Sequence, residues 1–326
     1  MVRLLRHEEL AGLLSPEEIM AAVRAGLEEQ GRGLVQVPPR LTLDSAAGHG
    51  WLRLMPAILN GSGYMGYKAM HSTPGVGVRY LVLLYDLREG TLLAILDADW
   101  LTVQRTAATA AVAVDLLARP EAETVGLLGS SEQARALLRA VARVRRLRRG
   151  RVFSPTPAHR ERFAAELGAE LGLALEPVAD PETAVRDAAL VLSAIRAGRE
   201  PVLRAEWLAP GCHVTAISAV RPEARELDDG VWRRSAVVVV DDRAHAFESG
   251  DGRSALASGS LRAEAAAELW EVACGRRPGR GDPQQVTLFK SVGTALQDLC
   301  VAAALYQRAL ERGLGQELGE FPHLRR

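Results

Sequence analysis

A short turn of glycine and serine is the first feature of this sequence that suits a charged ligand. The segment ETVGLLGSSEQARALLRAV predicts a strand, a tight turn and a helix. The turn consists of Gly129, Ser130, Ser131, Glu132 and Gln133. Such a turn aims backbone N–H groups and the positive end of a helix dipole at a phosphate. Dinucleotide-binding turns usually carry glycine at the position of Ser131. The pattern predicts a dinucleotide diphosphate site, and a plain packing turn is the alternative.

The interval after this turn bears on the identity of the dinucleotide. An NAD-specific fold places an acidic side chain near the end of the second strand, where it accepts a hydrogen bond from the ribose 2′-hydroxyl. No Asp or Glu occurs between Glu132 and Glu161. The segment offers Ser154, Thr156 and Arg160 instead. These side chains suit a 2′-phosphate, so the sequence favours NADP(H), with NAD(H) as the alternative.

Three cations occupy positions that strand and helix periodicity does not predict to be plain surface. Arg40 lies in VPPRLTL, Lys68 in GYMGYKAM and Arg105 in LTVQRTAATAA. Converging cations bind carboxylates or phosphates, and arginine offers two parallel donors to one carboxylate. Spacing alone leaves open that each is a solvated or ion-paired residue. His71 is a candidate proton carrier near Lys68, with a structural role as its alternative.

The first part of the chain is expected to be rich in strands. Ser15 and Pro16 predict the start of a helix that runs to about Gln30, because serine caps helices and proline suits the first helical position. Strands are expected at 35–43, 51–59, 66–70, 79–86 and 91–97, the last two as an antiparallel hairpin. An alanine-rich helix from about Leu101 to Arg119 then connects two domains.

Strands and helices alternate after this connector. Strands are expected at 124–128, 151–153, 189–195, 213–218 and 236–241, with helices at 133–144 and 158–171. This alternation is typical of a parallel α/β sheet. A final helix at about 292–312 is expected to return to the first domain. The sequence therefore predicts an α/β protein with a Rossmann-type parallel-sheet domain at 118–289. An α+β domain comprises 1–117 and 290–326.

Composition excludes several classes of function. The length of 326 residues fits about two domains. The 40 Lys and Arg residues balance the 40 Asp and Glu residues, which disfavours a nucleic-acid partner. The charged N-terminus MVRLLRHEEL and the lack of a long apolar run predict a cytoplasmic protein without a membrane partner. The three cysteines show no metal-binding or disulfide pattern, so no metal is expected.

A series of motifs resembles the ornithine cyclodeaminase/mu-crystallin family. In order, they are PPR, GYK, LTVQRTAATAA, GLLGSSEQA, RPEARELD, VVVVDDRAHAFESGD and FKSVGTALQD. The resemblance implies that the α+β domain binds substrate and forms a homodimer, while the Rossmann-type domain binds the dinucleotide. It also implies that Arg40, Lys68 and Arg105 hold a substrate carboxylate, with Lys68 taking part in catalysis. The implied cofactor-binding residues are Thr106, Gly129, Ser130, Ser131, Glu132, Gln133, Ser154, Thr156, Arg160, Ser291 and Val292, the last two near the nicotinamide.

One departure from the family pattern bears on the reaction. Cyclodeaminases have an acid–base aspartate where this chain has Val220, which cannot transfer a proton. The local string VRPEARELDD resembles the ketimine reductase side of the family. We therefore expect an NAD(P)H-dependent reductase of a small carboxylate-bearing imine, such as pyrroline-2-carboxylate or piperideine-2-carboxylate. The alternatives, in order, are an alanine-type amino-acid dehydrogenase, an ornithine cyclodeaminase, and a non-enzymatic NADPH-dependent binder of a small ligand.

Overall fold

The computed structural model describes residues 1–319, which divide between two compact units. Unit 1 comprises Met1–Arg105 and Thr294–Arg326, and unit 2 comprises Thr106–Gly293. The last seven residues of the expected 290–326 segment lie outside the described range. The first boundary between the units lies inside helix α3 (Asp99–Leu117), because Ala110 and Val114 belong to the apolar core of unit 2.

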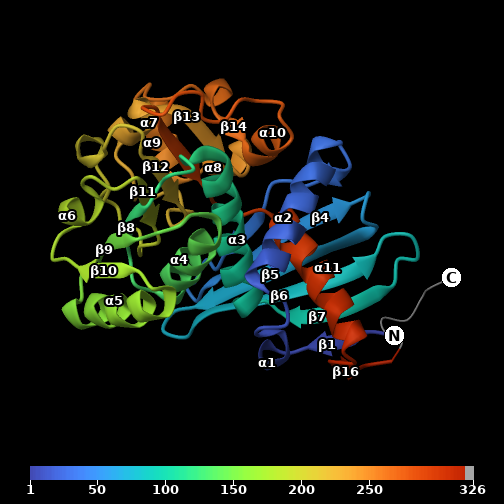
Figure 1. Cartoon of the computed structure of the whole chain (residues 1–326). Helices are drawn as coiled ribbons and strands as arrows, with labels where there is room; N and C mark the ends of the chain where they lie inside the picture. Colours follow the sequence, from blue (N-terminus) through green and yellow to red (C-terminus); the bar gives the residue numbers. More distant parts are fainter. Residues whose placement is uncertain (320–326) are drawn as a thin grey trace. The chain divides into compact units, whose positions relative to one another are not determined.

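A mixed sheet forms the framework of unit 1 (Figure 1). Its strands are β1 (Arg3–Leu5), β2 (Val35–Gln36), β3 (Leu41–Asp44), β4 (Trp51–Leu59), β5 (Tyr64–Thr73), β6 (Gly77–Asp86), β7 (Leu92–Asp97) and β16 (Gln316–Glu317). The order is β16-β1-β7-β6-β5-β4-β2, and β3 also pairs with β4. The predicted hairpin is confirmed as the antiparallel pair β6–β7. The single strand expected at 35–43 is wrong, because Pro38 and Pro39 lack backbone donors and separate β2 from β3.

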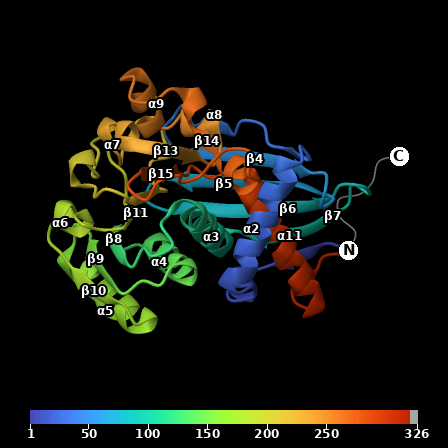
Figure 2. The same cartoon turned by 45° about the horizontal axis from the view of Figure 1, so that its top comes forward.

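Two helices cover one face of this sheet. Helices α2 (Pro16–Gly31) and α11 (Ala295–Glu311) lie side by side in both views, and α11 also packs on β4, β5 and β6 (Figures 1 and 2). The predicted start of α2 is confirmed, since Ser15 Oγ accepts the N–H of Glu18 at 3.2 Å. The predicted return of the final helix to the first domain is confirmed too. A short helix α1 (His7–Leu10) completes unit 1.

A fully parallel sheet forms the framework of unit 2 and confirms the Rossmann-type expectation. Its order is β10-β9-β8-β11-β12-β15-β13-β14. The strands are β8 (Thr124–Leu128), β9 (Arg149–Phe153), β10 (Ala174–Pro177), β11 (Leu190–Ser193), β12 (His213–Ala216), β13 (Ser235–Val240), β14 (Ala267–Glu268) and β15 (Val286–Lys290). Strand β15 was not expected. Every residue of β15 is buried, so its sequence VTLFK lacks the alternation that marks a half-exposed strand.

Short helices connect these strands. They are α4 (Glu132–Val144), α5 (Pro157–Leu171), α6 (Pro181–Val185), α7 (Asp229–Arg234), α8 (Arg243–Ala246), α9 (Gly250–Ala257), α10 (Leu269–Ala273) and the 3-10 turns η1 (Ala205–Trp207) and η2 (Ala263–Ala265). Helices α4 and α5 pack against each other, and α5 also packs against β9 and β10 (Figure 2). Within residues 1–319, no helix is long and apolar enough to cross a membrane.

The core of unit 2 contains one fully buried histidine, His213, at the start of β12. Its Nδ1 lies 2.8 Å from Thr287 Oγ1, and its Nε2 lies 2.9 Å from Thr215 Oγ1. Burial, with the nearby charge of Arg280, lowers the pKa of the imidazole to about 3. His213 is therefore neutral in the folded protein at physiological pH.

This buried imidazole predicts sensitivity of the fold to acid. The unfolded chain takes up a proton at His213 near its ordinary pKa of about 6.5, whereas the folded state resists protonation down to about pH 3. As the pH is lowered through this window, the free energy of unfolding should therefore fall by up to roughly 1.4 kcal/mol per pH unit. In denaturant titrations between pH 4 and 7, the free energy of unfolding of His213→Gln should depend less steeply on pH than that of wild type. His159→Gln, at an exposed position on α5, should keep the wild-type slope.

Candidate functional site

Lys68 is a fully buried cation in the middle of β5. Its side chain is 1% exposed, and its cross-strand neighbours are the buried Met55 and Val82. The Nζ atom donates a hydrogen bond to Asp298 Oδ1 at 2.8 Å. A buried ammonium needs such a partner, because removing it from water is costly. The structure therefore contradicts the alternative in which Lys68 is a solvated strand residue.

The carboxylate of Asp298 also pairs with Arg105. Arg105 Nε lies 2.8 Å from the same Asp298 Oδ1, and Arg105 Nη1 donates to Gln297 Oε1 at 2.7 Å. Arg40, just before β3, is near enough for its charge to act on Lys68. Lys68 and Arg105 therefore share one carboxylate, and the half-buried Arg40 adds a further positive charge that acts on Lys68. We call Arg40, Lys68, Arg105 and Asp298 the cation cluster.

The surroundings make Lys68 unusually acidic. Burial lowers its pKa most, and the charges of Arg105 and Arg40 act in the same direction. Asp298 opposes them by attracting the protonated form, and the resulting pKa is about 8 instead of 10.5. Lys68 is thus mostly protonated at neutral pH but can release a proton far more readily than an exposed lysine.

Sequence reasoning missed Asp298 and Gln297, although both lie in the quoted motif SVGTALQD. Both side chains are almost completely buried, at 0% and 2% exposure. Asp298 shares a helical face with Ala295 and Ala302, which are also buried. A carboxylate in an otherwise apolar helical stripe is rarely buried without a partner, and this was the available signal.

The structure contradicts His71 as a proton carrier beside Lys68. His71 and Lys68 are three residues apart on β5, so their side chains point to opposite faces of the sheet. His71 is exposed, whereas Lys68 is buried. The periodicity of a strand therefore separates the two groups.

In unit 2, the turn after β8 has the form that a diphosphate requires. Gly129 adopts φ +114°, and a Cβ atom there would lie 2.3 Å from the carbonyl oxygen of Ala194. Only glycine fits this close approach. Ser131 has an ordinary φ of −73° and caps α4 through its hydroxyl, which accepts the N–H of Ala134 at 3.4 Å. The residues of this turn therefore fit a dinucleotide diphosphate without glycine at position 131.

The other predicted cofactor-binding residues near this turn and on α3 differ in exposure. Ser130 and Gln133 are partly buried, Glu132 is exposed in the first turn of α4, and Thr106 is partly buried on α3. Arg135 and Arg139, also on α4, pair with Glu166 and Glu170 of α5 at 2.7 Å.

Beyond the end of β9, the structure brings the three candidates for the adenosine end together. Ser154 is 5% exposed, and its hydroxyl donates to the carbonyl of Thr156 at 3.4 Å. Arg160 Nη1 donates to the carbonyl of Ser154 at 2.9 Å. Thr156 caps α5 without a hydrogen bond from its side chain. A guanidinium and two hydroxyls thus lie near the position where NAD-specific folds carry an acid.

The residues expected at the nicotinamide end lie on another part of the same sheet edge. Ser291 and Val292 directly follow β15 and are buried. Val220 follows β12 and packs against the apolar cluster of Val240, Ala246 and Val292. An apolar side chain therefore occupies the place where the family resemblance would otherwise supply a proton-transfer group.

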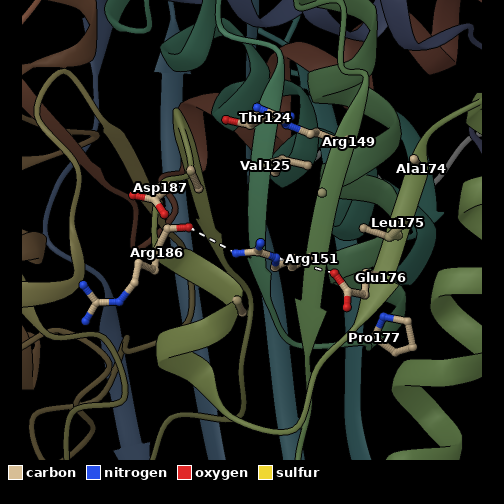
Figure 3. Close-up of a pocket in the computed structure, with 13 residues that line it drawn as sticks. Thr124, Val125, Arg149, Arg151, Ala174, Leu175, Glu176, Pro177, Arg186 and Asp187 are labelled. Atoms are coloured by element: carbon tan, nitrogen blue, oxygen red, sulfur yellow. Dashed lines mark hydrogen bonds and ion pairs between the residues drawn. The ribbon is translucent and has the colours of Figure 1, made fainter.

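A cavity of about 750 Å³ in unit 2 includes none of the predicted site residues (Figure 3). It lies near the first residues of β8, β9 and β10, at the end of the sheet opposite Gly129. Arg151 points between the carbonyl of Arg186, at 3.5 Å, and the carboxylate of Glu176, at 3.6 Å (Figure 3). The guanidinium of Arg151 in this cavity is thus already paired with groups of the same chain. Residues 1–319 contain no cluster of three His, Cys, Asp or Glu side chains able to hold a metal ion.

Comparison with known sequences identifies relatives along almost the whole chain. Residues 2–313 match the sequence model of the ornithine cyclodeaminase/mu-crystallin family. Delta(1)-pyrroline-2-carboxylate reductase of Bacillus cereus is 31% identical over 95% of this chain and 97% of its own. Alanine dehydrogenase of Archaeoglobus fulgidus is 32% identical over 98% of both chains. Ketimine reductase mu-crystallin of Mus musculus is 33% identical over 92% of this chain and 93% of its own.

Solved structures resemble this chain over a similar extent. Delta(1)-pyrroline-2-carboxylate reductase of Thermococcus litoralis, in complex with NADH and L-proline, has a TM-score of 0.92 and 31% identity, covering 97% of this chain and 100% of its own. An archaeal alanine dehydrogenase dimer with bound NAD has the same TM-score and identity, covering 98% of this chain and 99% of its own.

Proposed function

Because this chain belongs to the ornithine cyclodeaminase/mu-crystallin family, we propose that it reduces a small imine that carries a carboxylate, with NAD(P)H as hydride donor. Its substrate would be of the pyrroline-2-carboxylate or piperideine-2-carboxylate type. Relatives that are 31% and 33% identical are a pyrroline-2-carboxylate reductase and a ketimine reductase. The observation that carries the proposal is the cation cluster, in which the buried Lys68 and Arg105 share the single carboxylate of Asp298.

The charge of the cation cluster supports recognition of a carboxylate. Two buried cations, Lys68 and Arg105, pair with the single negative charge of Asp298, and the charge of Arg40 also acts on Lys68. Electrostatic attraction is stronger at a buried site than in water, so the surplus favours an anionic group. Fixing the carboxylate also orients the imine carbon for attack from one face.

Reduction of an imine also needs a proton for its nitrogen. The buried ammonium of Lys68 is the candidate donor, because its pKa of about 8 makes it a better acid than an ordinary lysine. A substrate that enters as a protonated iminium needs no donor, and Lys68 then acts only through the carboxylate. Val220 offers no group to activate the water that a cyclodeaminase requires.

The cofactor completes the chemistry when it binds at the turn that begins at Gly129, where it supplies the hydride for the imine carbon. We propose that NADPH serves at least as well as NADH. The acid-free interval from 133 to 160 and the guanidinium of Arg160 beside the Ser154 carbonyl support this preference. The two related structures contain NADH and NAD. In our proposal, this chain also accepts NADPH because Arg160 engages the 2′-phosphate.

We also propose that the protein is a cytoplasmic homodimer. Apolar side chains on one face of β3, β4 and β6 are exposed in the isolated chain: Leu41, Leu43, Leu52 and Leu81. Exposed apolar groups gathered on one sheet are typical of a protein interface, and the similar archaeal alanine dehydrogenase is a dimer. The three free cysteines fit a reducing compartment.

An alanine-type dehydrogenase is the second candidate. It is favoured by the 32% identity to the Archaeoglobus fulgidus enzyme. Both reactions deliver hydride to a carbon bonded to nitrogen beside a carboxylate, so the cation cluster would serve either. The difference lies in whether the imine is supplied preformed or arises from a keto acid and ammonia.

A substrate panel tests the proposed reaction. Oxidation of NADPH or NADH should be rapid with pyrroline-2-carboxylate or piperideine-2-carboxylate and at least tenfold slower, in kcat/KM, with pyruvate plus ammonia, a difference of about 1.4 kcal/mol. Ornithine with NAD should release no ammonia, because Val220 cannot activate water. A higher kcat/KM with pyruvate plus ammonia than with either cyclic imine would favour the dehydrogenase. Stoichiometric proline from ornithine would show that another group replaces the missing aspartate.

Replacement of Lys68 tests the cation cluster. Lys68→Met keeps most of the aliphatic stem but removes the charge, so kcat/KM should fall about thirty- to a hundredfold, or roughly 2 to 3 kcal/mol. The wild-type rate should decline above about pH 8, where Lys68 loses its proton, and the variant should lack this decline. Its dissociation constant for NADPH should stay within twofold of wild type.

Arg79→Met is the matched control for Lys68→Met, because Arg79 is an exposed cation on the neighbouring strand β6. Its kinetics should be normal. Unchanged kinetics of Lys68→Met would remove Lys68 from substrate binding. If Lys68→Met lost NADPH affinity by the same factor as kcat/KM, Lys68 would instead be assigned to cofactor binding.

Arg160 tests the cofactor preference. Arg160→Gln should raise the KM for NADPH about tenfold, the scale of one lost charge-assisted bond to phosphate, and should leave the KM for NADH unchanged. Arg162→Gln, at an exposed position on α5, should change neither value. A wild-type preference for NADH of tenfold or more in kcat/KM would contradict the proposed use of NADPH.

A further inference from the structure

Four consecutive strands of the unit 2 sheet are joined to one another where they end. In the sheet order these are β11, β12, β15 and β13, all parallel, so their carboxyl ends meet at one edge. Open α/β sheets bind ligands at this edge. The side chains that join the strand ends are carboxylates, and the proposed reaction uses none of them.

Asp241, the first residue after β13, holds the segment that follows β15. Its Oδ2 atom accepts the N–H of Gly293 at 2.6 Å, the N–H of Val292 at 3.0 Å and the hydroxyl of Ser291 at 2.7 Å. Asp241 is only 4% exposed, so these bonds are shielded from water. Bonds to an ionised carboxylate are stronger than neutral ones. One side chain thereby fixes three successive residues of the neighbouring strand exit.

Glu226 does the same for the segment that follows β12. Its carboxylate accepts the N–H groups of Ser218 and Ala219 at 2.9 and 3.0 Å. It also accepts the hydroxyl of Ser193, at the end of β11, at 2.7 Å and pairs with the ammonium of Lys290, the last residue of β15. Glu226 and Lys290 are fully buried. The exits of β11, β12 and β15 are therefore tied to one carboxylate.

This arrangement determines which part of a dinucleotide the edge can accept. In folds with this strand order, the diphosphate lies at the turn after the first strand, and the two nucleosides lie over the two halves of the sheet. The half containing β9 and β10 carries Ser154 and Arg160. The half containing β12 and β15 has strand exits whose N–H groups are already bonded to carboxylates, so these N–H groups are not available to a phosphate. It suits an uncharged group such as a carboxamide.

We propose that Asp241 is a positioning residue for the nicotinamide end of the cofactor. It acts through the segment Ser291–Gly293, which it holds as a rigid surface for the nicotinamide. This inference rests on the proposed function in one respect, namely that the chain binds a nicotinamide dinucleotide. It does not depend on the identity of the imine.

Cofactor-binding measurements test the role of Asp241 without catalysis. Asp241→Asn keeps the shape of the side chain but removes its charge and turns one accepting oxygen into a donor. The dissociation constant for NADH should rise about tenfold or more, as expected for a lost charge-assisted bond. The dissociation constant for ADP-ribose, which lacks the nicotinamide, should stay within twofold. The emission spectrum of bound NADH should also shift toward that of free NADH.

Two further variants sharpen the comparison. Ser291→Ala keeps the carboxylate and removes one donor, so it should raise the NADH dissociation constant about fivefold, again without an effect on ADP-ribose. Asp282→Asn is the matched control. Asp282 is an exposed aspartate whose carboxylate accepts the N–H of Gln284 at 2.6 Å, in the loop before the opposite end of β15. It should bind both ligands as wild type does.

The outcomes separate this inference from the proposed function. Equal weakening of NADH and ADP-ribose binding by Asp241→Asn, or no weakening of either, would overturn the positioning role. If Asp241→Asn fails to fold, the comparison of NADH binding with ADP-ribose binding in Ser291→Ala decides. Wild-type protein that binds neither NADH nor NADPH would overturn the proposed function and this inference together. Wild-type protein that binds NADH but reduces no imine would overturn only the proposed reaction.

Discussion

The Oδ1 atom of Asp298 lies 2.8 Å from the ammonium of Lys68 and 2.8 Å from the guanidinium of Arg105. Two cations in the interior of unit 1 are tolerable only because they share this counter-ion, since an unpaired buried charge would cost several kcal/mol. Asp298 is near the start of α11, so the return of the last helix to the sheet is what supplies the carboxylate. The packing of α11 and the ion pairing of both cations therefore depend on the same contact.

One carboxylate does not neutralise the two buried cations, Lys68 and Arg105, that pair with it. The structure keeps Lys68 charged near neutrality but lowers its pKa to about 8, because burial and Arg105 outweigh Asp298. A second carboxylate at this place would raise the pKa of Lys68 and reduce the surplus positive charge. A small anionic substrate can supply that second carboxylate from outside the chain.

At the edge of its sheet, unit 2 carries buried carboxylates, whereas the cluster of unit 1 consists mainly of cations. Asp241 and Glu226 occupy the N–H groups of the segments after β15 and β12, whereas the turn after β8 relies on Gly129 for a close backbone approach. Carboxylates thereby occupy backbone N–H groups along one part of an edge whose strands are all parallel. Val220 adds an apolar side chain near the same edge, because it packs against the cluster of Val240, Ala246 and Val292.

The amino-acid sequence alone determined the features that arise from local geometry. The start of α2 at Ser15 and Pro16, the hairpin β6–β7 and the turn at Gly129 depend on capping, alternation and a positive φ, which act over a few residues. The quoted motifs pointed to the family on the same local basis. Strand β15 escaped detection because a strand buried on both faces carries no alternation.

Only the tertiary structure decided which charges are partners. Lys68 and Asp298 are 230 positions apart in the chain, and Glu226 and Lys290 are 64 apart, so no local pattern relates them. The pKa of Lys68 depends on burial and on three charges from other elements, and the same strand that buries Lys68 exposes His71. Electrostatic energies depend on distance and dielectric environment, and folding alone sets both.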